Sequence, residues 1–106
     1  RDDLFFAGQS TGVEGYMGNS ATGRLAGINA TRMSLGEEPL TLPATTMLGA
    51  LCHYVTHADL KDFQPMKANF GILPPLDAKV NKRERGRAYA ERSLADLQIM
   101  MNGVQA

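Results

Sequence analysis

The stretch Leu4-Phe5-Phe6-Ala7-Gly8-Gln9-Ser10-Thr11-Gly12-Val13-Glu14-Gly15-Tyr16 decides how this chain is expected to fold. Its first four residues form an apolar run of the length and kind that are typical of a buried strand. The glycines that follow allow tight turns and a close approach of the backbone to another group. The sequence therefore predicts a short strand that enters a glycine-rich loop, and the loop leads into a helix.

The expected helix begins near Asn19 or Ser20, because either side chain is suited to cap a helix start. Gly36, followed by Glu37-Glu38-Pro39, is typical of its end. Two glycines lie inside this helix, and each costs about 1 kcal/mol relative to alanine. A helix that tolerates them is expected to make close contact with a strand, another helix or a ligand.

Two more helices are predicted downstream. The first runs from about Ala44 to Ala58 after Pro43, and its apolar side chains recur at helical spacing: Leu48, Leu51, Cys52 and Val55. The second spans roughly Ala78 to Met101 and is expected to stop at Gly103. Its stripe consists of Ala90, Leu94, Leu97 and Met101. Residues 59–76 are expected to form a loop that packs against the rest. The fold class is therefore mainly α, with about three helices and one short N-terminal strand.

The charges are unevenly spread although the 106 residues sum to zero. Residues 1–78 carry a net charge of −3 and residues 79–106 a net charge of +3. The basic side chains that are suited to neutralise phosphates are Lys79, Lys82, Arg83, Arg85 and Arg87. Acidic residues are interleaved with them, as on any solvated helix. Contact with a nucleic acid and a plain solvated face therefore both remain open.

The chain begins with Arg1 and reaches its apolar run almost at once, which indicates a piece cut from a longer chain. An unpaired strand and a helix face of small residues would leave apolar surface exposed. Self-association of the piece is therefore expected. No run of about 18 apolar residues is present, so no membrane span is expected, and the single cysteine fits a reducing cytoplasm.

The glycine-rich loop is a candidate ligand site. A helix start exposes backbone N–H groups and a partial positive charge, which suit an anion or a carbonyl oxygen. The dinucleotide fingerprint G-x-G-x-x-G, with an acidic residue about 20 positions later, is absent. A tight strand-to-helix turn without any ligand is therefore an equally good interpretation of the spacing alone.

Two blocks of the sequence resemble a known flavoprotein superfamily. The first is Leu4-Phe5-Phe6-Ala7-Gly8-Gln9, then Gly12, Gly15-Tyr16, Gly23 and Ala26-Gly27-x-Asn29-Ala30. It resembles the second FAD-contacting segment of that superfamily, which has two tRNA-modifying branches. The second block is Leu48-Gly49-Ala50-Leu51-Cys52-His53-Tyr54-Val55-Thr56 together with Phe63-Gln64-Pro65-Met66-Lys67-Ala68-Asn69-Phe70-Gly71-Ile72-Leu73-Pro74-Pro75-Leu76. It is similar to the branch of FAD- and folate-dependent tRNA (uracil-5-)-methyltransferases.

The resemblance implies a C-terminal piece of a doubly wound α/β FAD-binding fold. Residues 1–36 would be the second FAD-contacting strand–loop–helix segment, and residues 37–106 a C-terminal helical segment. The parent would use FAD, with methylenetetrahydrofolate as carbon donor and NADPH or NADH as reductant, to methylate uridine C5 in the T-loop of tRNA. This piece would need the missing N-terminal part of the same chain and would be inactive alone.

The resemblance also assigns roles to single residues. Those that match the motif facing the flavin and its ribityl chain are Gly8, Gln9, Gly12, Val13, Glu14, Gly15 and Tyr16. Their expected contribution is donation of backbone N–H groups to the flavin's carbonyl edge. Glu14 would alternatively seat the folate pterin or lie in solvent, and Tyr16 would stack on a ring or pack in the core. No catalytic residue is expected here, because the family's catalytic cysteines match no position of this chain.

The remaining candidates are weaker. Cys52 lies on a helix stripe and is expected to be an inert core thiol. His53 and His57 share a helix face, but no further ligand sits at suitable spacing, so no metal site is expected. Two other functions stay open: the sister branch, which modifies wobble uridines with FAD but without folate, and a helical interaction module without a cofactor.

Overall fold

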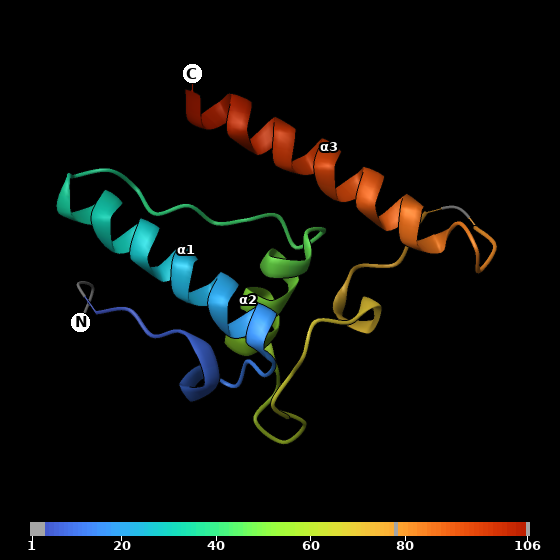
Figure 1. The fold of residues 1–106 in the computed structure, drawn as a ribbon, viewed down its shortest axis with the longest axis horizontal. Coiled ribbons are helices and arrows are strands. Elements are labelled where there is room, and N and C mark those ends of the chain that lie inside the picture. Colours follow the sequence, from blue (N-terminus) through green and yellow to red (C-terminus); the bar gives the residue numbers. More distant parts are fainter. Residues whose placement is uncertain (1–3, 78, 106) are drawn as a thin grey trace.

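The computed structural model describes residues 4–77 and 79–105, with side chains described as far as residue 103. It contains the 3-10 helix η1 (Gly8–Thr11), the helices α1 (Tyr16–Ser34) and α2 (Met47–His57), the 3-10 helix η2 (Phe70–Ile72) and the helix α3 (Arg85–Gln105). Helices α1 and α2 pack together, and α3 extends along another side of the molecule (Figure 1). The chain is therefore mainly α, as the sequence predicts.

Helix α1 starts earlier than predicted, and neither Asn19 nor Ser20 caps it. Its N-cap is Gly15, whose φ of 87° and ψ of 152° turn the chain directly into the helix. The amide of Asn19 already donates to the Gly15 carbonyl at 3.0 Å, so Asn19 lies inside the first turn. Glycine is favoured at position 15 because a side chain is strained at this positive φ.

The end of α1 follows the prediction. Gly36 adopts a φ of 78°, and its amide donates to the Met33 carbonyl at 3.1 Å. The next amide, that of Glu37, donates to the Arg32 carbonyl at 2.8 Å. These two bonds form a Schellman motif, in which the glycine satisfies carbonyls that the helix leaves free.

The segment after α1 runs back along the helix, as Figure 1 shows for the chain between α1 and α2. Asn29 holds it there, because its side chain is only 8% exposed and forms two hydrogen bonds with one residue. Its Oδ1 accepts from the Leu40 amide at 2.6 Å, and its Nδ2 donates to the Leu40 carbonyl at 3.0 Å. A buried amide group with both functions satisfied stabilises this crossing.

Helix α2 is shorter than the predicted range 44–58. It begins after Thr46, whose Oγ1 accepts from the Gly49 amide at 3.0 Å and so caps the helix. Residues 43–46 form a turn in which the Thr46 amide donates to the Pro43 carbonyl at 3.0 Å. Helix α2 supplies the core residues Ala50 and Leu51, which are 1% and 2% exposed.

The predicted N-terminal strand is not formed. Residues 4–7 have no ladder partner, and the only strand-type pairing within residues 4–77 and 79–105 is an isolated parallel bridge between Val13 and Met66. The predicted burial is also wrong for Leu4 and Phe6, which are 52% and 71% exposed. No described segment lies beside this stretch to pair with it, and a lone strand is not stable in water.

Helix α3 is displaced relative to the prediction. It begins at Arg85, because Asn81 closes a preceding turn by accepting from the Glu84 amide through its Oδ1 at 3.0 Å and its carbonyl at 3.1 Å. Ala78, the expected start, lies outside the described residues. The helix continues past Gly103, which therefore does not end it. Within the predicted stripe, Leu94 is 67% exposed, whereas Leu97 is partly buried.

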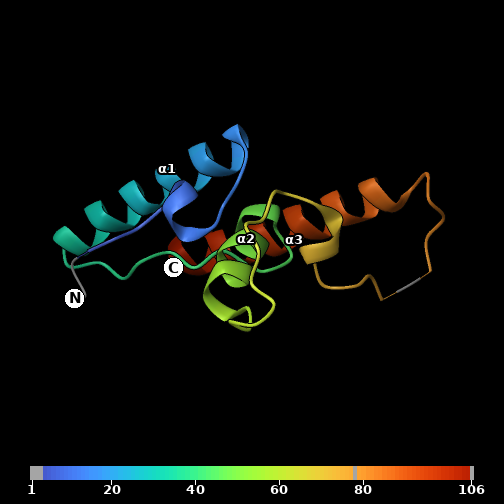
Figure 2. The same ribbon diagram turned by 90° about the horizontal axis from the view of Figure 1, so that it is seen from below.

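Hydrogen bonds and a stacked aromatic pair attach α3 to the rest of the molecule. Thr45 donates to Asp96 Oδ2 at 2.6 Å, and the rings of Phe70 and Tyr89 stack with centroids 4.9 Å apart. Arg92 donates to the carbonyls of residues 74 and 75 at 2.6 and 2.9 Å. In Figure 1 helix α3 lies on the far side of α1 from η1, and Figure 2 shows the same arrangement from below. Within the described residues, no helix is both long enough and apolar enough to cross a membrane.

The packing at Gly49 predicts a stability change. A Cβ on Gly49 would collide with the Pro43 carbonyl oxygen and lie 2.7 Å from Thr46 Oγ1. We therefore expect Gly49→Ala to lower the free energy of unfolding by about 1–3 kcal/mol, the usual range for overpacking. Gly23→Ala is the matched control, because no described atom lies within 4 Å of a Cβ there; it should raise stability by up to about 1 kcal/mol. Equal urea midpoints for the two variants would contradict this packing.

Candidate functional site

The glycine loop, defined as residues 8–15, is fastened to α1 at its first residue. Gly8 is buried, and its amide donates to the Thr22 hydroxyl at 3.2 Å. That hydroxyl in turn donates to the Gly18 carbonyl at 2.9 Å. Thr22 is 7% exposed, so both bonds lie away from water. An unpaired buried amide would lower the stability of the fold. The Thr22 hydroxyl therefore holds the Gly8 amide, and with it the start of η1, against α1.

The loop then closes on itself. The amides of Gly12 and Val13 donate to the carbonyls of Gln9 and Gly8 at 3.1 and 3.4 Å. The Thr11 hydroxyl also donates to the Gly8 carbonyl, at 2.6 Å. Gly12 adopts a φ of 99°, which permits the reversal.

A distant segment completes the loop. The Glu14 amide donates to the Met66 carbonyl at 2.8 Å, and the Met66 amide donates to the Gly12 carbonyl at 2.7 Å. Val13, between these bonds, is 0% exposed. The amides of Gly8, Gly12, Val13 and Glu14 therefore all have acceptors within the chain. Their expected donation to a flavin stays a prediction, since in this structure these four amides are engaged within the chain.

The backbone that remains accessible lies at the end of the glycine loop, where α1 begins. No side chain forms a capping hydrogen bond at the start of α1, and the first amides of a helix have no acceptor within the helix. Tyr16 and Met17 are 93% and 82% exposed at this end. A Cβ on Gly15 would approach nothing closer than Lys67 Cγ, at 4.0 Å. Gly15, Tyr16 and Met17 therefore form an accessible, electropositive helix end.

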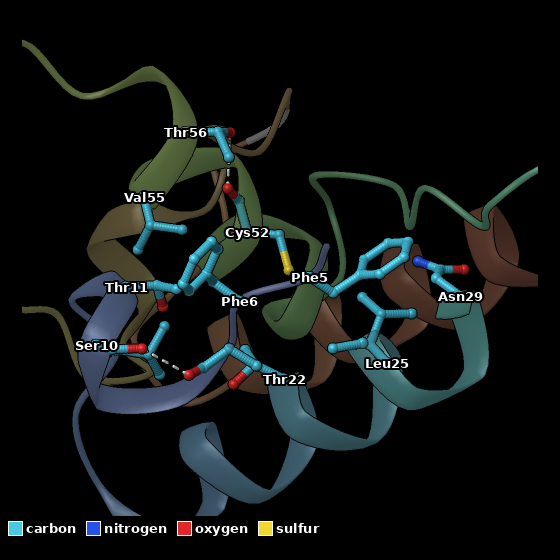
Figure 3. A pocket seen from close by; sticks show the side chains of 13 residues that line it. Phe5, Phe6, Ser10, Thr11, Thr22, Leu25, Asn29, Cys52, Val55 and Thr56 are labelled. Atoms are coloured by element: carbon cyan, nitrogen blue, oxygen red, sulfur yellow. Dashed lines mark hydrogen bonds between the residues drawn. The ribbon is translucent and has the colours of Figure 1, made fainter. Parts of the chain in front are cut away.

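An apolar groove of about 470 Å³ lies beside the glycine loop, between residues 5–7, α1 and α2. Figure 3 shows side chains from all three parts around it, among them Phe6, Leu25 and Cys52. Of the seven residues that the sequence assigns to the cofactor, Val13 alone lines this groove. Its polar side chains, such as Thr22 and Asn29, are engaged in the internal hydrogen bonds described above.

Cys52 borders this groove and is half-buried. Burial raises the pKa of its thiol above the ordinary value of 9.0, because the thiolate would lose hydration. The thiol therefore stays protonated at neutral pH and is a poor nucleophile.

The two histidines stack on each other at the surface of α2. Their ring centroids are 4.1 Å apart with an interplanar angle of 8°. His57 Nδ1 lies 3.0 Å from the His53 carbonyl oxygen and 2.8 Å from Thr56 Oγ1. No group of three or more metal-binding side chains occurs within the described part of the chain.

The predicted basic residues are all exposed, and two of them have partners. Arg87 Nε lies 3.0 Å from Glu91 Oε1, and the Arg85 guanidinium lies 5.7 Å from the centroid of the Phe70 ring. Lys82 and Arg83 lie in the turn before α3, and Lys79 lies in the segment that precedes this turn. Figures 1 and 2 both place this turn away from the glycine loop, so the two candidate surfaces are separate.

The residues that support the glycine loop were not identified as site residues from the sequence. Thr22 lies on the helix after the loop, and Met66 comes about fifty positions later. The block Phe63–Leu76 stood out only through its family resemblance, since no local pattern pairs it with residues 12–14. A contact between segments so far apart is a property of the fold.

Two comparisons relate parts of the chain to known proteins. The family model described as Glucose inhibited division protein A matches residues 1–38. The methylenetetrahydrofolate–tRNA-(uracil-5-)-methyltransferase TrmFO of Lacticaseibacillus paracasei is 55% identical over 98% of this chain. The proteins of that name from Bacillus cytotoxicus and Lactiplantibacillus plantarum are 54% and 57% identical over 96% and 92% of it. The chain spans 24%, 24% and 22% of the length of these three relatives.

Proposed function

Since this chain is a homologue of the methylenetetrahydrofolate–tRNA-(uracil-5-)-methyltransferases across about a quarter of their length, we propose that it is the C-terminal part of such an enzyme. The proposed reaction is methylation of uridine C5 in the T-loop of tRNA, in the cytoplasm. The observation that carries the proposal is an identity of 54–57% over 92–98% of the chain. The proposed division into residues 1–36 and 37–106 follows the two blocks of the sequence.

The second candidate is the sister enzyme that modifies wobble uridines. It is favoured by the match of residues 1–38 to the family model named Glucose inhibited division protein A. That match ends before α2, whereas the matches to the methyltransferases continue through α2 and into the later helices. Because the match to the methyltransferases covers more of the chain, it favours methylation of uridine C5 over modification of a wobble uridine.

The end of the glycine loop suits a flavin. A carbonyl edge that gains negative charge on reduction is stabilised by amide donors and by the positive end of a helix. In this proposal the amides of Tyr16 and Met17 are the donors; the absence of a side-chain cap and the open space beside Gly15 support it. In the proposed enzyme FAD supplies redox chemistry, methylenetetrahydrofolate supplies the carbon unit, and NADPH or NADH supplies the electrons.

The seven residues of the predicted site divide into two groups in this proposal. Gly8, Gly12 and Val13 shape the loop through their internal contacts. Glu14, Gly15 and Tyr16 would contact the ligand: the tyrosine ring would stack on a flat ring, and the carboxylate of Glu14 would accept N–H groups of a pterin. Gln9, which is exposed on η1 at the other end of the loop, stays a predicted contact.

The N-terminal part of the same chain is the proposed partner of residues 4–7. This stretch has extended backbone at Ala7, with a φ of −151° and a ψ of 165°, and exposes Leu4 and Phe6 beside the apolar groove. Pairing with a strand would satisfy its backbone and cover this surface. In the isolated 106-residue chain the same surface would favour self-association.

The activity can be tested with the full-length protein. We expect purified protein with bound FAD to transfer a methyl group to a T-loop uridine when methylenetetrahydrofolate, NADPH and a tRNA transcript are supplied. Mass mapping of RNase fragments would locate the product. A transcript with cytidine at that position is the control and should stay unmodified. Modification at the anticodon wobble position, or protein that cannot be loaded with FAD, would refute the proposal.

The basic turn before α3 is the proposed contact with tRNA. Lys82 and Arg83 are exposed and precede the helix. We expect Lys82→Glu and Arg83→Glu each to weaken tRNA binding and to reduce the slope of log K against log salt by about 0.7–0.9 per lost phosphate contact. Filter-binding titrations from low to high salt would measure this. Lys61→Glu, on an exposed turn elsewhere, is the matched control. Equal affinities for all three variants at low salt would remove this turn from the interface.

A further inference from the structure

The space in front of Gly12 is filled by an aromatic ring. A Cβ on Gly12 would lie 2.9 Å from Phe63 Cε1 and 3.4 Å from Cε2, and closer still to Cζ. The edge of the ring therefore rests against the backbone of the glycine loop. Position 12 needs glycine for this contact as well as for its φ of 99°.

Helix α2 holds Phe63 in this place. The rings of Phe63 and Tyr54 stack with centroids 5.7 Å apart and an interplanar angle of 25°. The Tyr54 hydroxyl accepts from the Gln64 amide at 3.1 Å, so the backbone beside the ring is tied to the same tyrosine. Since Tyr54 lies on α2 near the buried Leu51, the position of the ring is set by the core.

The segment that contains Phe63 contacts the glycine loop at a second point. Three residues after Phe63, the backbone of Met66 bonds to Gly12 and Glu14, on either side of the buried Val13. Glu14 is followed directly by Gly15 and the open end of α1. A displacement of residues 12–14 would therefore move the amides that the proposed function places against the flavin.

From these contacts we propose that Phe63, held by Tyr54, is a positioning residue that sets the glycine loop for flavin binding. The inference rests on the proposed function and adds residues that do not themselves touch the ligand. Catalytic geometry is sensitive to displacements well below 1 Å, which is why such support affects binding and redox properties.

The chain offers a matched control. Phe70 and Tyr89 form a second stacked pair, with centroids 4.9 Å apart and an interplanar angle of 22°. Phe70 is 43% exposed and Phe63 is 37% exposed, so the two phenylalanines are similarly buried. The second pair joins η2 to α3 and has no part in the contacts of Gly12 described above.

The test compares Phe63→Leu with Phe70→Leu in the full-length protein. The FAD dissociation constant is measured by quenching of flavin fluorescence, the midpoint potential of the bound flavin by dye equilibration, and folding by circular dichroism. We expect Phe63→Leu to weaken FAD binding about tenfold or more and to shift the potential, with Phe70→Leu close to wild type in both.

The outcomes separate the two proposals. A wild-type protein that binds FAD, with the same affinity and potential in Phe63→Leu, overturns this inference and leaves the proposed function intact. Wild-type protein that binds no FAD overturns both. If Phe63→Leu fails to fold, Tyr54→Phe decides, because it keeps the stack and removes only the acceptor of the Gln64 amide. Weaker FAD binding or a shifted potential in Tyr54→Phe supports the inference, and wild-type values overturn it.

Discussion

The structure depends on a pair of backbone hydrogen bonds between segments that are far apart in sequence. Met66 accepts from the Glu14 amide at 2.8 Å and donates to the Gly12 carbonyl at 2.7 Å. Val13 is completely buried between them, and its Cγ1 lies 2.9 Å from where a Cβ on Gly18 would be. This bridge closes the glycine loop against the α1–α2 core. With the loop closed, the amides of Gly12, Val13 and Glu14 donate to carbonyls within the chain. The start of α1 remains accessible.

The same constraint explains why the glycines of the loop are not equivalent. A Cβ on Gly8 would lie 3.3 Å from Asn19 Oδ1, and one on Gly12 would overlap the Phe63 ring. At both positions, contacts within the protein therefore leave little or no space for a side chain. At Gly15 the positive φ requires glycine, but the nearest atom is Lys67 Cγ at 4.0 Å, which leaves space for another molecule. The candidate ligand contact thus narrows from the whole loop to its last residues and the first turn of α1.

Local patterns predicted the helices, and long-range contacts decided what the patterns could not. The apolar spacing around Leu51 and the terminal Gly36 identified α2 and the end of α1, because both signals are contained within a few residues. The apolar run at residues 4–7 failed as a strand, because a strand needs a partner that the local sequence does not specify. The contacts of Phe63 and Met66 with the glycine loop were not predicted either, because they join segments that lie far apart in the sequence.

Amide hydrogen exchange in the 106-residue chain tests the central claim most directly, because it reports on the two bonds of the bridge themselves. The account predicts that the amides of Glu14 and Met66 are protected together, whereas those of Tyr16 and Met17 exchange rapidly at the open end of α1. Exchange of Glu14 and Met66 as fast as that of Tyr16 and Met17 would show that the bridge does not hold the loop, and would contradict the account.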